Sequence, residues 1–259
     1  HRRQSNHCIV RYVIHKLRQD WSPEIIAERL KIDYPDDDTM RVSHETIYRW
    51  IYLDASAGGT LYHHLRRKRK KRRRQKRYGS GRRFIPGRVG ISQRPAIVET
   101  RERFGDWEGD TIEGKKSTGY MATHVERKSR YLIAAKLSDK KAESLTSKSI
   151  KAFWHIPKRL RKTLTVDNGK EFARFKTLEE KTGLTVYFAD PYSAWQRGTN
   201  ENTNGLLRQY FPKGTDFHHI TEEDLAVAVK KLNHRPRKCL GYRSPHQVFW
   251  NRQTGALAI

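Results

Sequence analysis

Cysteine is scarce in this chain, and so are long apolar runs. Only two cysteines occur among 259 residues, Cys8 and Cys239, which excludes a disulfide framework and a cysteine-rich zinc site and suits a reducing cytoplasm. No apolar run approaches the roughly 20 residues that cross a bilayer, and no signal peptide is recognisable. We therefore expect a cytoplasmic protein without a membrane partner.

Acidic residues are outnumbered by basic ones. The chain has 28 Asp and Glu against 54 Lys and Arg, a formal net charge of +26, and an isoelectric point near 10.3. Such an excess predicts a polyanionic partner, nucleic acid before a membrane surface. Composition alone leaves open a ribosomal or chromatin-like basic protein.

Charge is unevenly distributed and divides the chain into three parts. Residues 1–64 hold nine Lys/Arg and nine Asp/Glu, residues 65–100 hold fifteen against one, and residues 101–259 hold thirty against eighteen. We predict a helical module over 1–64, a basic linker over 65–100 and an α/β domain over 101–259.

The first part has the pattern of three short helices. Apolar residues four apart along Ile9–Leu17 share one helical face. Ser22-Pro23-Glu24 combines a capping serine, a proline at the first helical position and an acid at the positive end of the helix dipole. Ser43 caps a third helix that is predicted to run through Leu53. This order matches a helix-turn-helix, whose last helix enters the major groove of DNA.

The outward face of the third helix supplies the DNA contacts predicted for this module. His44, Tyr48 and Arg49 are expected to point away from the core, with Glu45 beside them. The alternative is a small helical bundle with no DNA role, which the zero net charge of residues 1–64 leaves open.

The second part is a basic run of low complexity. Between Arg66 and Arg77 only Gln75 is uncharged, so the run is expected to be solvated and to neutralise phosphates without sequence preference. Order is expected to resume near Ile97. The predicted phosphate contacts in this run are Arg66, Arg67, Lys68, Arg69, Lys70, Lys71, Arg72, Arg73 and Arg74.

The third part alternates strands and helices. Strands are predicted over 107–112, 120–125, 130–137, 163–166 and 184–188, and helices over 140–154, 171–181, 199–210, 221–234 and 245–251. This order is that of the ribonuclease H fold, a mixed sheet with helices on its faces. The predicted fold class is therefore α/β and ribonuclease H-like, preceded by an all-α helix-turn-helix module.

Three carboxylates come from separate elements of this third part. Asp110 projects from the first strand, Asp167 leaves the end of the fourth, and Glu201 comes from a helix. Oxygen ligands suit Mg²⁺ or Mn²⁺, and two such ions can bridge one scissile phosphate. We therefore predict a site for two metal ions that acts on a phosphate backbone.

Each carboxylate also has a plainer explanation. Asp-Asn-Gly at 167–169 is a common turn, and Glu201 in a first helical turn favours the helix dipole. Asp110 is harder to dismiss, because an acid inside an apolar strand is costly unless it is used. The rival ligands are Asp106, Glu108, Glu113, Glu171 and Asp190, of which Glu108 is the nearest competitor because it shares a strand face with Asp110.

Two further segments are candidates for DNA contact. In the loop before Glu201, Trp195 or Tyr192 could wedge against a base and Arg197 could hold a phosphate; alternatively Trp195 packs the loop onto the domain. Near the C-terminus, a second basic segment could grip the DNA backbone or form a plain exposed turn. Its predicted contacts are Arg235, Arg237 and Lys238.

These segments together resemble a known family, the DDE transposases of the insertion-sequence-thirty family, which are relatives of retroviral integrases. The resemblance covers most of the chain outside the basic linker, and 195–202 is its most specific stretch. The matching segments are Trp21-Ser22-Pro23-Glu24, Gly105-Asp106-Trp107-Glu108-Gly109-Asp110, Val166-Asp167-Asn168-Gly169-Lys170-Glu171-Phe172, residues 195–210 and Asn233-His234-Arg235-Pro236-Arg237-Lys238.

The resemblance implies a catalytic triad of Asp110, Asp167 and Glu201. It also implies recognition of terminal inverted repeats by the helical module, Mg²⁺-dependent hydrolysis at the element's ends, and strand transfer by the freed 3′-hydroxyl with no covalent protein–DNA intermediate. Family members usually begin with a further helix-turn-helix, of which at most a remnant precedes Trp21, and the chain begins with His1 instead of Met. We expect an N-terminal segment to be missing.

The hypothesis is thus a prokaryotic, nucleoid-associated transposase that acts on double-stranded DNA as a homodimer or larger assembly. Two alternatives stand beside it. One is a DNA-binding repressor or domesticated remnant without catalysis, and the other is a metal-dependent nuclease that cuts without strand transfer.

Overall fold

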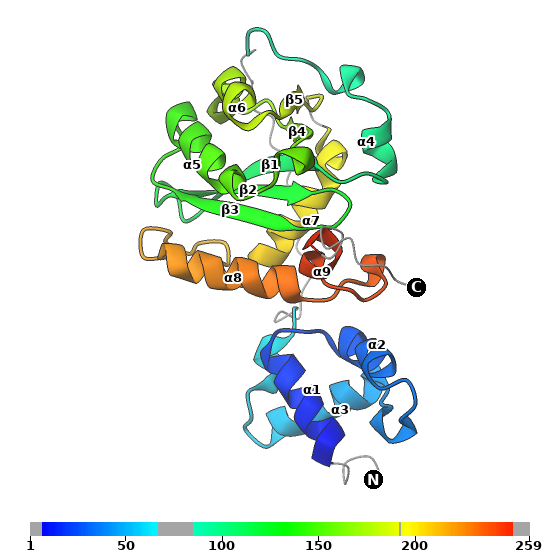
Figure 1. Ribbon diagram of the computed structural model, residues 1–259. Coiled ribbons are helices and arrows are strands. Elements are labelled where there is room, and N and C mark those ends of the chain that lie inside the picture. The colour runs from blue at the N-terminus through cyan, green and yellow to red at the C-terminus, as the bar shows by residue number, and fades with distance from the viewer. Residues whose placement is uncertain (1–6, 67–84, 192, 251–259) are drawn as a thin grey trace. The chain divides into compact units, whose positions relative to one another are not determined.

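The computed structural model describes residues 7–66, 85–191 and 193–250 (Figure 1). These residues form two compact units. The first consists of residues 7–66 with 234–248, and the second consists of residues 85–233, except 192, with Phe249 and Trp250. In the described parts of the chain, no helix combines the length and apolar character that crossing a bilayer requires.

The first unit is built from short helices around a small apolar core. Its elements are α1 (His7–Arg18), α2 (Pro23–Asp33), η1 (Asp38–Met40), α3 (His44–Ser56), η2 (Leu61–His64) and η7 (Lys238–Leu240). Ser22 and Ser43 cap α2 and α3, because each side-chain oxygen accepts a backbone N–H three residues on. The helix starts are thus those that the sequence predicts, whereas α3 continues to Ser56 and stops before Gly58, whose φ is +83°.

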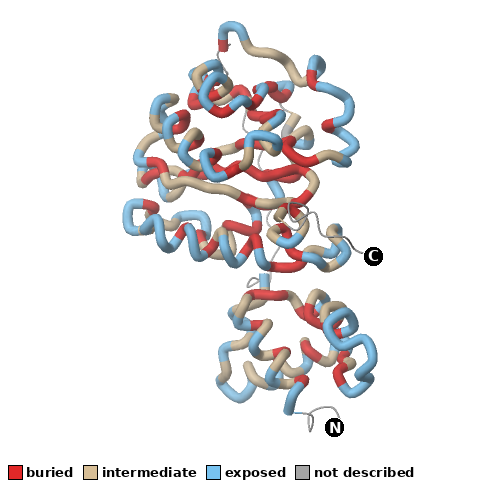
Figure 2. Tube along the Cα trace, in the orientation of Figure 1, coloured by how far each residue is buried: buried red, intermediate tan, exposed pale blue. Residues whose placement is uncertain are grey.

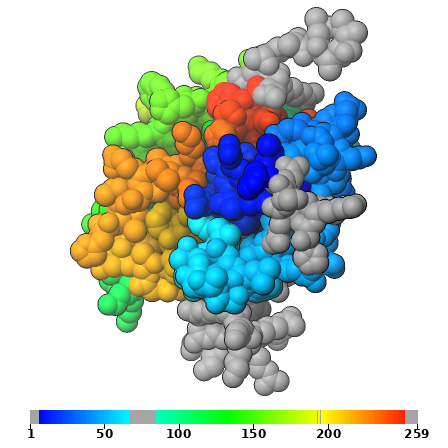
Figure 3. Space-filling model, turned by 90° about the horizontal axis from the view of Figure 1, so that it is seen from below, coloured from blue at the N-terminus to red at the C-terminus, as the bar shows by residue number. Residues whose placement is uncertain are grey.

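The core of this unit joins α1, α2 and α3. Its fully buried members are Ile9, Val13, Leu17, Ile26, Leu30, Ile47 and Ile51. Viewed from below, η2 covers the side of α1 (Figure 3). The packing leaves one face of α3 open to solvent.

The second unit contains a five-stranded mixed sheet. Its strands are β1 (Asp106–Glu113), β2 (Tyr120–Glu126), β3 (Leu132–Leu137), β4 (Thr163–Val166) and β5 (Thr185–Phe188), arranged in the order β3-β2-β1-β4-β5. β1, β2 and β3 are antiparallel, and β4 and β5 extend the sheet in parallel from β1. The predicted ribonuclease H-like α/β class is confirmed. β3 begins two residues later than predicted, because Arg130 has φ of +64° and belongs to the hairpin turn.

Helices cover both faces of this sheet (Figure 1). α5 (Ala142–Trp154) and α6 (Phe175–Thr182) lie on one face, and α7 (Gly198–Leu207) and α8 (Glu222–His234) lie on the other. Leu206 and Leu207 of α7 pack with Ile112 and Met121 of the sheet. The short elements are η3 (Ile91–Gln93), α4 (Ile97–Thr100), η4 (Lys158–Leu160), η5 (Lys170–Phe172), η6 (Ala194–Arg197) and α9 (Pro245–Trp250).

Order resumes earlier than the predicted position near Ile97. Ile85 and Val98 are buried, and Gly90 forms a parallel bridge with Phe188 of β5. The Val89 carbonyl accepts the Phe188 N–H at 2.9 Å, and Arg94 donates to Thr165 of β4 at 2.7 Å, so residues 85–100 belong to the second unit instead of the basic linker. The red interior segments in Figure 2 show the sheet buried between its two helical layers.

His124 of β2 is a buried ionisable group on the α5 side of the sheet. Its Nε2 lies 3.0 Å from Ser149 Oγ, and its Nδ1 has no hydrogen-bond partner among the described residues. Burial lowers the pKa of His124 to about 4, whereas an unfolded histidine titrates near 6.5. The unfolded chain therefore takes up a proton in this interval that the folded chain does not.

We expect the free energy of unfolding to fall as pH drops below about 6.5 toward 4. His124 alone should contribute a loss of about 2 kcal/mol between roughly pH 7 and pH 5. His124→Gln, which keeps a donor for Ser149, should abolish this component. Urea denaturation of both proteins across that range measures it, and an identical decline in the two would rule out His124 as the source.

Candidate active site

Two residues of the predicted triad lie on neighbouring parallel strands. Asp110 belongs to β1, and Asp167 follows directly after β4. Glu108 pairs with Thr165, so the same register continued by two residues brings Asp110 level with Asp167. Both side chains are partly exposed, Asp110 at 26% and Asp167 at 19%. The strand pairing therefore brings two reachable carboxylates together.

A single guanidinium lies between these carboxylates. Arg197, the last residue of η6, places Nη1 3.3 Å from Asp110 Oδ1 and Nη2 3.7 Å from Asp167 Oδ2. Nη1 also donates to the Gly109 carbonyl at 3.2 Å, while Nε is buried without a hydrogen-bond partner in the described residues. The pairs are longer than the 2.8 Å ion pairs elsewhere on β1. Arg197 is thus a loosely held cation that bridges two acids.

Helix α7 orients the Asp110 carboxylate from the other side. Asn204 Nδ2 donates to Asp110 Oδ2 at 3.1 Å. Thr123 pairs with Asp110 across β1 and β2, and its hydroxyl donates to Asn204 Oδ1 at 2.9 Å, which turns the amide nitrogen toward the acid. Burial raises the pKa of Asp110, and Asp167 raises it further, while Arg197 opposes both. Without a cation between them, Asp110 and Asp167 would therefore not both carry a negative charge readily.

Glu201 lies in the first turn of α7 with its side chain exposed. It is one turn before Asn204, the residue that reaches Asp110, so its Cα lies on the adjoining turn. Nowhere in the described ranges are three His, Cys, Asp or Glu side chains grouped closely enough to hold one metal ion. The structure brings Asp110 and Asp167 together and leaves the Glu201 carboxylate outside their cluster.

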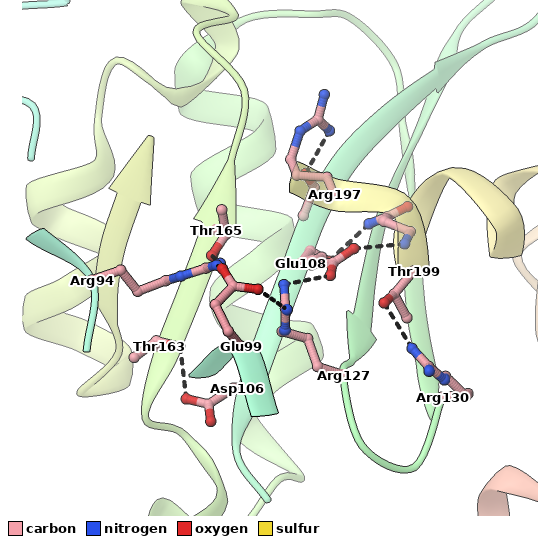
Figure 4. Close-up of polar contacts among 12 residues, drawn as sticks. Arg94, Glu99, Asp106, Glu108, Arg127, Arg130, Thr163, Thr165, Arg197 and Thr199 are labelled. Atoms are coloured by element: carbon pink, nitrogen blue, oxygen red, sulfur yellow. Dashed lines mark hydrogen bonds and ion pairs between the residues drawn. The ribbon is translucent and has the colours of Figure 1, made fainter. Parts of the chain in front are cut away.

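The nearest rival ligands are occupied within the fold. Glu108 is fully buried, and its Oε1 forms an ion pair of 2.8 Å with Arg127 Nη1. Asp106 is buried as well and pairs with Arg103 at 2.8 Å (Figure 4 shows both acids). Because protein cations already neutralise both acids, neither is available to a metal ion.

Glu171 and Asp190 are also engaged. Glu171 accepts from Thr111 Oγ1 at 2.9 Å and lies 3.1 Å from Lys140 Nζ, and Asp190 accepts from the Gln196 amide at 2.8 Å. Glu171 still borders the site across Gly169, where a Cβ would overlap the Glu171 carboxylate and lie 2.8 Å from Asp167 Oδ1. A side chain at position 169 would therefore displace the carboxylates of Glu171 and Asp167 from these positions.

In the loop before α7, one predicted DNA contact, Trp195, is exposed, and another, Arg197, is mostly buried. Trp195 is 74% exposed, so it does not pack the loop onto the domain. Arg197 faces Asp110 and Asp167 in place of solvent. Tyr192 lies outside the described residues.

The predicted contacts of the first unit are unequally accessible. His44, Arg49 and Arg66 are exposed, and Tyr48 is half-buried. Residues 67–74, which hold the other predicted linker contacts, lie outside the described residues. His44 and Arg49 on α3 are thus accessible to a partner.

The C-terminal basic segment is less accessible than predicted. Arg235 is only 4% exposed, so its side chain would have to move to contact a phosphate. Arg237 is half-buried. Lys238 is exposed, and its Nζ lies 2.8 Å from Glu24 Oε1. Of the three predicted contacts, Lys238 is thus the most accessible and Arg235 the least.

Comparison with known proteins adds to this geometry. Residues 101–194 match the Integrase core domain family. The transposase for insertion sequence element IS4351 of Bacteroides fragilis is 44% identical over 237 residues, which cover 92% of this chain and 71% of that protein. The transposase InsI for insertion sequence element IS30A of Escherichia coli strain K12 is 42% identical, covering 92% of this chain and 63% of that protein.

The chain belongs to the IS30-like insertion-sequence transposases. Its enzyme class is that of the polynucleotidyl transferases. Among solved structures, the catalytic core domain of BIV integrase has a TM-score of 0.48 and 19% identity, covering 59% of this chain and 97% of that one. The identities to the insertion-sequence transposases confirm the resemblance to the insertion-sequence-thirty family seen in the motifs.

The transposase also positions its site with residues that the motifs did not single out. Asn200 and Asn204 lie one turn apart on the buried face of α7, and Thr123 binds both amides. Asparagine is a poor helix former, so two of them four residues apart were a usable signal for a polar helix face that is turned inward.

A divalent cation held by Asp110 and Asp167 would have to displace the Arg197 guanidinium. Arg197→Gln should therefore increase the affinity of the free protein for Mn²⁺ by about tenfold, as expected when a charge-assisted hydrogen bond of about 1.5 kcal/mol is removed. It should also lower the melting temperature in EDTA, because the two acids then repel each other.

Isothermal titration and Mn²⁺ electron paramagnetic resonance measure this affinity. The matched control is Arg130→Gln, since Arg130 donates to Thr199 Oγ1 at 2.7 Å near the same helix end without touching either acid. Equal Mn²⁺ affinity in both variants and in the wild type would show that Arg197 does not occupy the cation position.

Proposed function

We propose that this transposase binds the terminal inverted repeats of its insertion sequence and cleaves and transfers DNA strands with a triad of Asp110, Asp167 and Glu201. The observation that supports this most directly is the pair of partly exposed aspartates that share one loosely bound cation. The other acids of β1 show how this fold neutralises a structural carboxylate, with an arginine at 2.8 Å. A protein that only binds DNA would have no use for two acids that are neutralised less closely.

The residues present fit one or two Mg²⁺ or Mn²⁺ ions. Asp110 and Asp167 would supply the shared oxygen ligands, and Glu201 would join them by a change of side-chain rotamer from the first turn of α7. Such ions activate a water or a 3′-hydroxyl and offset the charge on the phosphoryl oxygens.

The chain's own residues have separate tasks in this proposal. Asn204 holds the Asp110 carboxylate in a fixed orientation. Arg197, once released from the acids, would bind the phosphate next to the scissile bond, where a guanidinium can donate two hydrogen bonds. Trp195 is exposed beside it and would stack against a base.

DNA recognition is proposed for the other part of the chain. His44, Tyr48 and Arg49 of α3 would face the repeat, and the run from Arg66 to Arg74 would neutralise phosphates. Joining two element ends in one reaction requires at least two copies of the chain.

The test is cleavage and joining of an oligonucleotide that carries the element's end, taken from the DNA flanking its gene. With Mg²⁺ or Mn²⁺, the wild type should yield nicked and joined products. Asp167→Asn and Glu201→Gln should reduce both products by at least about 10³-fold, as expected when a group that stabilises the transition state is removed, and should leave DNA binding intact.

Three results would contradict this proposal in different ways. Nicking without joined product would favour the nuclease, and binding without either product would favour the repressor. Normal cleavage by Glu201→Gln would remove Glu201 from the site. Asp190→Asn is the matched control, because Asp190 is bonded to Gln196 and should be dispensable.

Neutralising the linker should weaken DNA binding without changing its selectivity. Replacing Lys68, Lys70, Arg72 and Arg74 with Gln should lower the affinity for the element's end and for unrelated DNA alike. The slope of log affinity against log salt should flatten by about 0.9 for each phosphate that is no longer neutralised. Fluorescence anisotropy at several salt concentrations measures both, with a charge-preserving shuffle of 66–77 as control. A loss confined to the element's end would contradict a purely electrostatic role.

A further inference from the structure

A network of charged side chains lies in the second unit next to the candidate site (Figure 4). Arg127 Nη1 lies 2.8 Å from Glu108 Oε1, and Arg127 Nη2 lies 3.1 Å from Glu99 Oε2. Glu99 in turn pairs with Arg94. Glu108, Arg127 and Arg94 are buried, whereas the Glu99 side chain is 65% exposed. The described residues thus place two arginines and two glutamates in one connected network.

This network touches each element that carries a triad residue. Glu108 is two residues before Asp110 on β1. Arg94 donates to Thr165 Oγ1 at 2.7 Å, and Thr165 is two residues before Asp167.

The third attachment is to α7. Glu108 Oε2 accepts the backbone N–H of Asn200 at 2.8 Å, one residue before Glu201. The network therefore ties β1, β4 and α7 to one another.

The attachment at α7 serves as a helix cap. Arg197, the N-cap residue of α7, makes no side-chain cap hydrogen bond, so the first N–H groups of the helix need an acceptor from elsewhere. Glu108 supplies it from β1, and its negative charge also suits the positive end of the helix dipole. In the opposite direction, Asn200 Nδ2 donates to the Glu108 backbone carbonyl at 2.8 Å. The start of α7 is thus fastened to β1 at two points.

Stability alone is a poor explanation for this arrangement. Replacing a buried ion pair with packed apolar side chains is often neutral or stabilising, because desolvation offsets the attraction. Burial lowers the pKa of Arg94 to about 10, with neighbouring Arg127 adding to the effect, and Arg127 Nε is buried without a partner among the described residues. What the network does provide is a fixed distance between three elements.

We propose that Glu108 and Arg127 are positioning residues: they set the start of α7 and thereby hold the backbone of Glu201 where a change of rotamer brings its carboxylate to Asp110 and Asp167 for metal binding. The proposal rests on the triad stated under Proposed function. Arg94 and Glu99 extend the same network to residues 91–100, so that segment and α7 are both fixed to it.

The test separates position from stability by replacing both partners at once. Glu108→Leu with Arg127→Met removes the two charges and keeps apolar volume, so the melting temperature should stay within a few degrees of the wild type. The affinity of the free protein for Mn²⁺ should fall at least about tenfold, the usual effect of removing a residue behind a metal ligand. The kcat for end cleavage should fall in parallel, while KM and the affinity for the end oligonucleotide stay unchanged.

A second variant tests for rescue. Glu108→Gln with Arg127→Gln restores an uncharged acceptor for the Asn200 N–H and should recover most of the Mn²⁺ affinity. The matched control is Asp106→Leu with Arg103→Met. Asp106 is a buried acid on the same strand, and it bonds to Arg103 and to Thr163 of β4 instead of α7. This control should bind Mn²⁺ as the wild type does.

Wild-type Mn²⁺ affinity and kcat in the folded Glu108→Leu, Arg127→Met protein would overturn the proposal and leave the triad standing. Equal loss of Mn²⁺ affinity in the Asp106→Leu, Arg103→Met control would overturn it as well, because the effect would then be general to β1. A wild-type protein that binds no Mn²⁺, with Asp167→Asn as reference, would remove the triad and this proposal together.

Discussion

The pairing of acids on β1 with arginines outside that strand is the constraint on which the second unit depends. Strand alternation places Asp106, Glu108 and Asp110 on one face of the sheet. Three carboxylates in a row on a covered face repel one another and lose hydration, so each needs a cation. Each of them has an arginine within 3.3 Å, and these are Arg103, Arg127 and Arg197 in the order of the acids.

The three acid–arginine pairs differ in solvent exposure, and this difference distinguishes the two structural pairs from the one in the candidate site. The first two acids are buried and pair at 2.8 Å, so their arginines belong to the fold. Asp110 is partly exposed and pairs at 3.3 Å with an arginine that it shares with Asp167. A cation that is loosely held and shared can be exchanged for another. Pairing with arginine therefore makes Asp106 and Glu108 structural and leaves Asp110 accessible to another cation.

Helix α7 connects this strand to the third proposed ligand. The first two turns of its inward face are polar, because Asn200 and Asn204 bind the strand backbone, Thr123 and Asp110. Polar contacts specify orientation more closely than apolar packing does, since each donor needs an acceptor at a set distance. On β1, Glu108 holds α7 and Asp110 would bind metal; on α7, Asn200 and Asn204 hold the strand and Glu201 would bind metal. One short strand thus both fixes the helix and carries a proposed metal ligand.

Local patterns in the sequence determined much of this protein. Ser22 and Ser43 mark helix starts because a side-chain oxygen caps the N–H groups that follow it, and the motifs around Asp110, Asp167 and Glu201 identify the family without any structure. The order of strands and helices was sufficient for the ribonuclease H-like class. Errors in the fold were confined to element ends and to residues 85–100, where the backbone of Val89 and Gly90 pairs with the distant strand β5.

Only the tertiary structure decided which acids are free and which basic residues are hidden. Glu108 and Asp110 are equivalent by strand alternation, and they differ because Arg127 reaches one from a hairpin turn and Arg197 reaches the other from the loop that precedes α7. Arg235 has the sequence context of a surface residue and is buried. The reason is physical: the partner of a charge is whichever group the packed chain brings within a few ångströms, and that proximity is not encoded in the residues next to it.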